Sequence, residues 1–183
     1  YYVYDHYSNL RYVIPPKASE SLTADAEYSD THTALSSLCY IYKYDYRNRL
    51  ISKKLPGMGA QYFAYDRADR LTYSQDAEQR NDGNKASFML YDRYGREVMS
   101  GLTVSLSTGL QAIADTLQYS FPQATFKLNN VTTLFGYTIP QSNIESSGVM
   151  HIKYYDDYSF LSIYEEHADS LAYTSRQGYG VRK

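Results

Sequence analysis

Two acidic doublets, Asp156-Asp157 and Glu165-Glu166, are the candidates for acid–base chemistry in this sequence. Glycoside hydrolysis requires two carboxyl groups that face each other across the scissile bond. Adjacent residues of a strand project from opposite faces of a sheet, so neither doublet forms such a pair by itself. The sequence also contains no nucleophile elbow, phosphate-binding loop or dinucleotide-binding fingerprint. We therefore expect that this chain is not an enzyme.

Metal-binding residue types are present, but they lack the spacing of known metal sites. The single cysteine, Cys39, excludes an internal disulfide and a cysteine-built zinc site, and no two histidines have the spacing of a helical zinc site. Residues 78–89 resemble a calcium loop around Gly83, but Arg80 stands at a ligand position and Met89 at the last one. We expect Asp82-Gly83 to be a hairpin turn instead, and we expect no metal and no other cofactor. The histidines are His6, His32, His151 and His167.

The composition excludes several classes of partner and favours β structure. The 18 basic and 20 acidic side chains give a net charge of −2, which is too weak to attract nucleic acid or an anionic membrane. No apolar run is long enough to insert into a bilayer. Tyrosine is in excess, with 23 of 183 residues, and its ring packs well across strands while its hydroxyl reaches a polar partner. The length predicts one domain, and the opening Tyr1-Tyr2-Val3-Tyr4 lies inside a strand pattern, so we expect 1–183 to be a single fragment of a longer protein.

An imperfect repeat runs through the chain. Each copy, which we call a YD unit, begins with Tyr-Asp, continues through a short polar stretch and ends at an aliphatic residue. The aliphatic residue stands six positions after the tyrosine in four units and one position later in the fourth. The units are Tyr4-Asp5 with Leu10, Tyr44-Asp45 with Leu50, Tyr65-Asp66 with Leu71, Tyr91-Asp92 with Val98, and Tyr155-Asp156 with Leu161.

Each YD unit is predicted to be a β-hairpin. Before the second unit, residues 38–44 place Leu38 and three tyrosines at alternating positions, which predicts a strand with aromatic side chains on one face. The motif aspartate can bond its own backbone two residues on, and Asn9, Asn48 and Gly95 tolerate the positive φ of a turn. A return strand is expected at 50–55, ended by Pro56-Gly57.

Six arginines lie in these turns near the aspartates. Exposed ion pairs contribute about 0–1 kcal/mol each, so we interpret the arginines as solvated side chains. They are Arg47, Arg49, Arg67, Arg70, Arg93 and Arg96.

The units resemble the Rhs/YD-repeat signature, in which Tyr-Asp is followed by a variable pair, then Gly or Asn, Arg and Leu. The strings at 44–50, 65–71 and 91–96 carry this resemblance, and 54–57 and 154–161 are further similar to large surface or secreted proteins of Bacteroides-like bacteria. Ser8-Asn9 and Ser159-Phe160 replace the Gly-Arg pair in the first and last units. The residues that match the motif are Tyr4, Asp5, Leu10, Tyr44, Asp45, Arg49, Leu50, Tyr65, Asp66, Arg70, Leu71, Tyr91, Asp92, Gly95, Arg96, Tyr155, Asp156 and Leu161.

The resemblance implies a mainly β fold, in which consecutive antiparallel YD-repeat hairpins form a curved or spiralling sheet that can enclose a hollow. It implies a non-catalytic structural segment of an extracellular or cell-surface polymorphic toxin carrier, with flanking repeats and an enclosed C-terminal toxin domain as partners. Open strand edges are expected to self-associate. The alternative is a carbohydrate-binding or cell-adhesion module that presents tyrosine platforms to surface glycans. Alternating tyrosines favour cross-strand packing and hence the structural role.

Two insertions between units are predicted to contain short helices, at about 17–38 and 106–121. In the first, Asp30 is the expected cap of a helix at 31–38 with Leu35 and Leu38 facing inward. In the second, residues 110, 113, 114 and 117 are apolar and recur at helical spacing. Residues 125–139, around Asn129-Asn130, are predicted to form a further hairpin.

Overall fold

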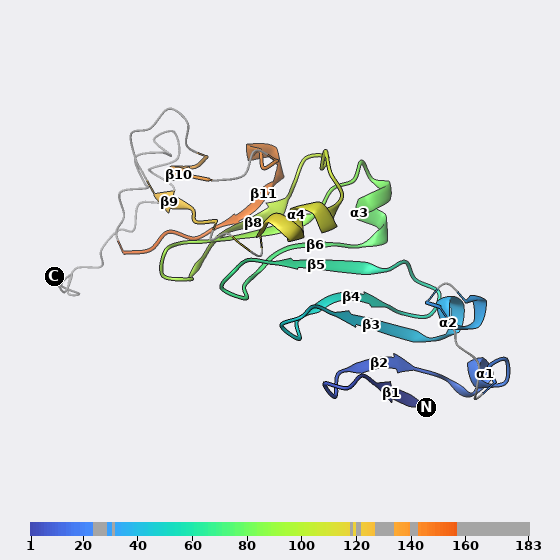
Figure 1. Cartoon of the computed structure of the whole chain (residues 1–183). Helices are drawn as coiled ribbons and strands as arrows, with labels where there is room; N and C mark the ends of the chain where they lie inside the picture. Colours follow the sequence, from blue (N-terminus) through green and yellow to red (C-terminus); the bar gives the residue numbers. More distant parts are fainter. Residues whose placement is uncertain are drawn as a thin grey trace, which may run out of the picture.

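A nine-stranded antiparallel sheet dominates the computed structural model, which describes residues 1–23, 29–30, 32–117, 119, 122–126, 134–139 and 143–156. The strand order is β1-β2-β3-β4-β5-β6-β7-β8-β11, so consecutive strands are neighbours in the sheet through β8 (Figure 1). The sheet is open, and among the described residues β1 and β11 are its edge strands. The predicted mainly β class is confirmed. The nine strands are β1 (Tyr2–Tyr4), β2 (Leu10–Val13), β3 (Tyr40–Tyr44), β4 (Leu50–Lys54), β5 (Gln61–Tyr65), β6 (Leu71–Gln75), β7 (Ser87–Tyr91), β8 (Glu97–Leu102) and β11 (Val149–Ile152).

The YD units and the helices occupy opposite ends of the strands. The hairpins β1–β2, β3–β4, β5–β6 and β7–β8 each turn at a Tyr-Asp pair, and their turns lie along one side of the sheet in Figure 1. The connections at the other end carry three short helices. These helices are α1 (Pro16–Ser19), α2 (Thr33–Leu38) and α3 (Ala77–Asn81).

The main core lies on one face of β5–β8. Strand pairing places Ala64 opposite Tyr73, and Tyr73 opposite Phe88, and all three side chains are buried. Helix α4 (Leu110–Leu117) packs against this face, with Leu110 and Leu117 buried in the same cluster. The helix predicted within 106–121 is therefore present, over a shorter span.

A smaller core lies beneath α1 and α2, and it contains Ala18, Leu35 and Cys39. The predicted helix before β3 is confirmed, but its cap is not Asp30. The N-terminal flanking residue is His32, while Asp30 accepts a hydrogen bond from the Tyr12 hydroxyl and forms an ion pair with Lys43.

The strand predicted over 38–44 is shorter than expected. Leu38 ends α2, and β3 begins at Tyr40. Its buried side chain is Ile41, which is 4% exposed, while Tyr40 remains exposed. The return strand β4 and the turn at Gly57, with a φ of 71°, follow the prediction.

The connection between β6 and β7 differs from the prediction of a hairpin turn at Asp82-Gly83. It contains α3, which begins with a capping box: the Gln79 N–H donates to Asp76 (2.8 Å), and the Asp76 N–H donates to the Gln79 side chain (2.9 Å). Asp82 ends this helix through a bond from its N–H to the Glu78 carbonyl (2.7 Å), and Gly83 follows with a φ of 70°. The dipeptide therefore ends a helix rather than turning a hairpin.

The chain leaves the sheet after β8 and returns beside the same strand as β11. Between them lie α4 and a two-stranded sheet of β9 (Thr125–Phe126) and β10 (Tyr137–Thr138), which confirms the two ends of the predicted hairpin. Asn129-Asn130 lies outside the described residues. A short 3-10 helix, η1 (Ser146–Gly148), precedes β11. None of the helices in the described ranges is long and apolar enough to cross a membrane.

Candidate functional site at the hairpin turns

The four described hairpin turns share one backbone geometry. In each, the N–H of the motif aspartate donates to the carbonyl of the residue four positions later, and its carbonyl accepts from the N–H three positions later, at 2.9–3.1 Å. The residue at that third position has a positive φ, and the strand register shifts just before the motif tyrosine. These features define a turn closed by a left-handed residue, with a bulge in the ladder. The left-handed residues are Ser8 (65°), Asn48 (60°), Asp69 (63°) and Gly95 (81°).

The first turn forms in spite of its departure from the motif, but Asn9 does not have the role predicted for it. Ser8 takes the positive φ. Asn9 instead donates its side-chain N–H to Asp5 (3.2 Å) and to Asn48 of the next turn (3.0 Å).

The fourth unit has the same length as the others, so the prediction of an extra residue is wrong. Tyr91 pairs with Glu97 in the register in which Tyr65 pairs with Leu71. Glu97 thus occupies the expected aliphatic position, where its carboxylate bonds the Lys153 ammonium (3.0 Å). Val98, the next residue, is buried in the core.

A carboxylate and a guanidinium close each of the next three turns. Asp66 is fully buried; its Oδ1 accepts from the N–H groups of Ala68 (2.8 Å) and Arg70 (3.0 Å), and its Oδ2 accepts from the Nε of Arg70 (2.8 Å). The planar fork of an arginine suits this carboxylate geometry. We call such an aspartate and the arginine four residues later a clasp. The three clasps are Asp45–Arg49, Asp66–Arg70 and Asp92–Arg96.

Each clasp arginine also contacts the tyrosine of the following unit. The distances from the guanidinium carbon to the ring centroid are 5.0 Å for Arg49 and Tyr65, 4.7 Å for Arg70 and Tyr91, and 4.2 Å for Arg96 and Tyr155. These are cation–π distances. The clasps therefore connect neighbouring hairpins as well as closing their own turns.

The hydroxyl of the motif tyrosine reaches back to the preceding unit. The hydroxyl of Tyr65 donates to the Leu50 carbonyl at 3.0 Å, and that of Tyr155 donates to the Glu97 carbonyl at 2.9 Å. Asp156 accepts two bonds from the Arg96 guanidinium, at 3.0 and 2.8 Å. The fifth unit therefore begins in the same manner as its predecessors, while Leu161 lies outside the described residues.

The interpretation of all six turn arginines as solvated is wrong for Arg49 and Arg70, whereas the side chain of Arg96 keeps 33% of its surface exposed. The Arg49 side chain is 12% exposed and that of Arg70 is 17% exposed, because each is enclosed by its aspartate and the next tyrosine. Arg47, Arg67 and Arg93 are exposed, as expected. Arg47 nevertheless donates to the Arg67 carbonyl (3.0 Å) and to Asp69 (2.9 Å).

Arg96 and its surroundings favour the ionised form of two carboxylates, those of Asp92 and Asp156. Burial alone raises the pKa of Asp92, but hydrogen bonds from Arg96 and Tyr94 outweigh this effect and leave the pKa below its ordinary value. The Arg96 side chain likewise lowers the pKa of Asp156. A carboxylate with a lowered pKa is a poor proton donor at neutral pH, so Asp92 and Asp156 suit a structural role better than general acid catalysis.

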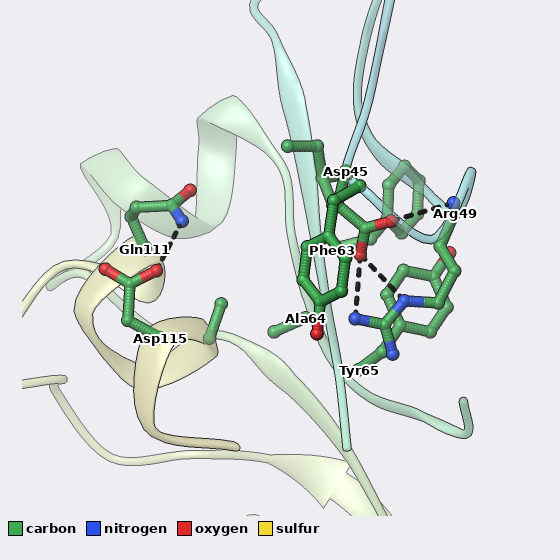
Figure 2. Close-up of a pocket in the computed structure, with 10 residues that line it drawn as sticks. Asp45, Arg49, Phe63, Ala64, Tyr65, Gln111 and Asp115 are labelled. Carbon is green, nitrogen blue, oxygen red and sulfur yellow. Dashed lines mark hydrogen bonds and ion pairs between the residues drawn. The ribbon is translucent and has the colours of Figure 1, made fainter. Parts of the chain in front are cut away.

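A pocket of about 280 Å³ opens between the turn of β3–β4, β5 and α4. Figure 2 shows Asp45 and Arg49 on one side and Gln111 and Asp115 on the other, with Phe63 between them. Asp45 and Arg49 are joined by their clasp, and Gln111 donates to Asp115 at 3.0 Å. A second hollow, of about 510 Å³, is lined by Tyr46, Arg47, Arg67 and Tyr119, so the two share Tyr46.

The remaining candidates for chemistry do not assemble into a site in the described part of the chain. No three His, Cys, Asp or Glu side chains there are grouped as a metal site requires. Cys39 is buried, which raises its pKa and disfavours the reactive thiolate. Asp156 is paired with Arg96, whereas Asp157, Glu165-Glu166 and His167 lie outside the described residues.

No family model matches the chain, and comparison with known proteins shows a distant similarity to a mosquito protein. Over 117 residues, or 63% of its length, the chain is 26% identical to salivary gland surface protein 1 of Aedes aegypti. The match covers 4% of that protein, so the chain spans a small part of its relative.

Proposed function

We propose that this chain is a non-catalytic structural segment of an extracellular Rhs/YD-repeat shell, part of a large secreted or cell-surface polymorphic toxin carrier. One observation carries the proposal: each clasp arginine contacts the aspartate of its own hairpin and the tyrosine of the next one. A motif that joins neighbours in this way suits an array of stacked units.

The energetics of the array favour stacking over independent hairpins. A single two-stranded hairpin is marginal in water, so most of its stability must come from its neighbours. Each link combines an arginine–aromatic contact, worth about 0.5–2 kcal/mol, with a tyrosine hydroxyl bond of about 1 kcal/mol. Repeated along the sheet, these links stabilise a continuous wall.

The partners follow from the same geometry. Among the described strands, β1 and β11 have one unpaired edge each, which can accept flanking repeats of the parent chain. The spiralling sheet, the hollow and the toxin cargo are proposed because the sequence resembles Rhs proteins. The word "surface" in the name of the mosquito relative supports a location at or outside the cell surface.

Electron microscopy of the full-length parent protein tests this proposal. We expect a closed, hollow particle whose wall contains this segment. A solid rod or a chain of separate domains would overturn the shell.

Hydrogen exchange on the present chain tests the link itself. We expect Arg70→Met to accelerate amide exchange in both hairpins that its clasp joins, β5–β6 and β7–β8. Arg93→Met is the control, because Arg93 is an exposed arginine of the β7–β8 turn that stacks on Tyr94 of its own turn. Faster exchange confined to β5–β6 would count against a clasp that joins neighbours.

A further inference from the structure

Two hollows adjoin at Tyr46, on the side of the molecule where the turn of β3–β4 faces α4. We define the Tyr46 surface as Tyr46, Arg47, Phe63, Gln111, Asp115 and Tyr119, all of which line one hollow or both. The hollows have volumes of about 280 and 510 Å³, so the second lies within the range of about 300–1,000 Å³ for small-molecule sites and the first lies just below it.

Two tyrosines of this surface differ from the motif tyrosines in their exposure to solvent. Tyr46 and Tyr119 are each 75% exposed, whereas Tyr65 and Tyr91 are partly buried under clasp arginines. Tyr46 is the variable residue that follows the motif aspartate. An exposed ring with a polar tip offers an apolar face and a hydrogen-bonding group to a ligand.

The charges around the hollows balance. Three aspartates and three arginines lie in or beside the hollows, and ion pairs join Arg49 to Asp45 (2.7 Å) and Arg47 to Asp69 (2.9 Å). Such an arrangement produces no strong net field for an anion or a cation. It does offer many hydrogen-bond donors and acceptors, to which the Gln111 amide adds one group of each kind. The six charged residues are Asp45, Asp69, Asp115, Arg47, Arg49 and Arg67.

We propose that the Tyr46 surface binds a neutral oligosaccharide. A sugar ring has an apolar C–H face that can stack on Tyr46 or Tyr119, and its hydroxyls both donate and accept hydrogen bonds. Arg47 donates to sugar oxygens, and Gln111 both donates and accepts. The length of surface that joins two hollows suits a chain of sugars better than a single one. This inference does not depend on the proposed shell, because the hairpins β3–β4 and β5–β6, α4 and Tyr119 form the whole site.

Glycan-array screening of the intact chain, followed by calorimetric titration of the best neutral oligosaccharide, tests the inference. We expect Tyr46→Ala to weaken binding about tenfold, and Tyr119→Ala to have a similar effect, as the loss of one stacking contact predicts. Tyr7→Ala is the matched control, because Tyr7 is an exposed turn tyrosine that lines neither hollow. Gln111→Ala, on the exposed face of α4, tests the polar contacts without touching a turn.

Each result has a definite reading. Binding that falls in the Tyr46 and Tyr119 variants but not in Tyr7→Ala, with thermal melting unchanged, supports the site. Binding restricted to charged glycans, binding equally affected by Tyr7→Ala, or no glycan binding would overturn it. None of these outcomes bears on the hollow particle expected for the parent protein.

Discussion

The hydroxyl of Tyr91 donates a 2.8 Å hydrogen bond to the carbonyl oxygen of Leu71, which ties the motif tyrosine of one hairpin to the return strand of the hairpin before it. Tyr65 and Leu50 repeat the relationship one unit earlier. The YD pair therefore has two tasks: its aspartate turns the chain, and its tyrosine fastens the turned chain to its neighbour.

Removing one tyrosine hydroxyl should weaken one such attachment. Tyr91→Phe keeps the ring and its contact with Arg70 but leaves the Leu71 carbonyl without this donor, so we expect a loss of about 1 kcal/mol in the free energy of unfolding. Urea denaturation measures this loss. Tyr46→Phe, with an exposed side chain, should change stability by less than about 0.5 kcal/mol. Equal losses in both variants would contradict the role given to the Tyr91 hydroxyl.

Removing a clasp carboxylate should be more damaging. Asp66→Ala leaves two backbone N–H groups and a largely buried guanidinium without their acceptor, so we expect a loss of about 3 kcal/mol. Asp82→Ala is the control, because Asp82 is 76% exposed and makes a surface ion pair worth about 0–1 kcal/mol. The comparison uses denaturation midpoints at constant pH, and a loss below 1 kcal/mol for Asp66→Ala would argue against a structural clasp.

The pairing of β8 with β11 requires a glycine at position 101. A Cβ added to Gly101 would overlap the backbone of Gly148 and Met150, so Gly101→Ala must push the two strands apart. We expect a loss of about 1–3 kcal/mol and faster amide exchange in β11. Gly109→Ala is the matched control, because no atom outside its chain neighbours lies within 4 Å of the position its Cβ would take. Unchanged exchange in β11 of Gly101→Ala would contradict the close approach of these strands.

The Asp92–Arg96 clasp should also make stability depend on pH in the acidic range. Burial opposes ionisation of Asp92, but its hydrogen bonds prevail and lower its pKa, while unfolded aspartate titrates near about pH 3.9. As the pH falls, the unfolded chain therefore takes up the proton first, and stability present above about pH 4 is lost as the pH drops through the folded-state pKa. The urea midpoint should fall over this window, and Asp92→Asn should flatten the slope. A midpoint that is constant or rises with acidity would exclude the predicted linkage.

The turns could be predicted from the sequence because their causes are local. An aspartate that bonds its own backbone favours this turn, and Asn48 and Gly95 tolerate the positive φ three residues later, although Ser8 and Asp69 take that position in the other two turns. The links between units could not be predicted in the same way. Whether Arg70 is solvated or enclosed depends on which strand lies beside it, and that is a property of the sheet order. Treating the arginines as isolated surface charges therefore missed the contacts that Arg49, Arg70 and Arg96 make with the tyrosine of the following unit.

Two local errors have equally specific causes. Apolar character singled out Val98 as the last residue of the fourth unit, although the turn fixes the paired position at Glu97 whatever its polarity. Helix α3 was missed because it has no buried side chain and so no apolar periodicity. The spacing of Asp76 and Gln79 was the available signal, since it matches a capping box.

The excursion between β8 and β11 leaves and re-enters the sheet at the same strand. The strand order therefore does not depend on how long this segment is, because both of its ends lie beside β8. Its composition is constrained all the same, since Leu110, Leu117 and Tyr137 are buried in the core on β5–β8. A tag or a foreign domain would thus be tolerated as an insertion that adds to this segment, and not as a replacement of it.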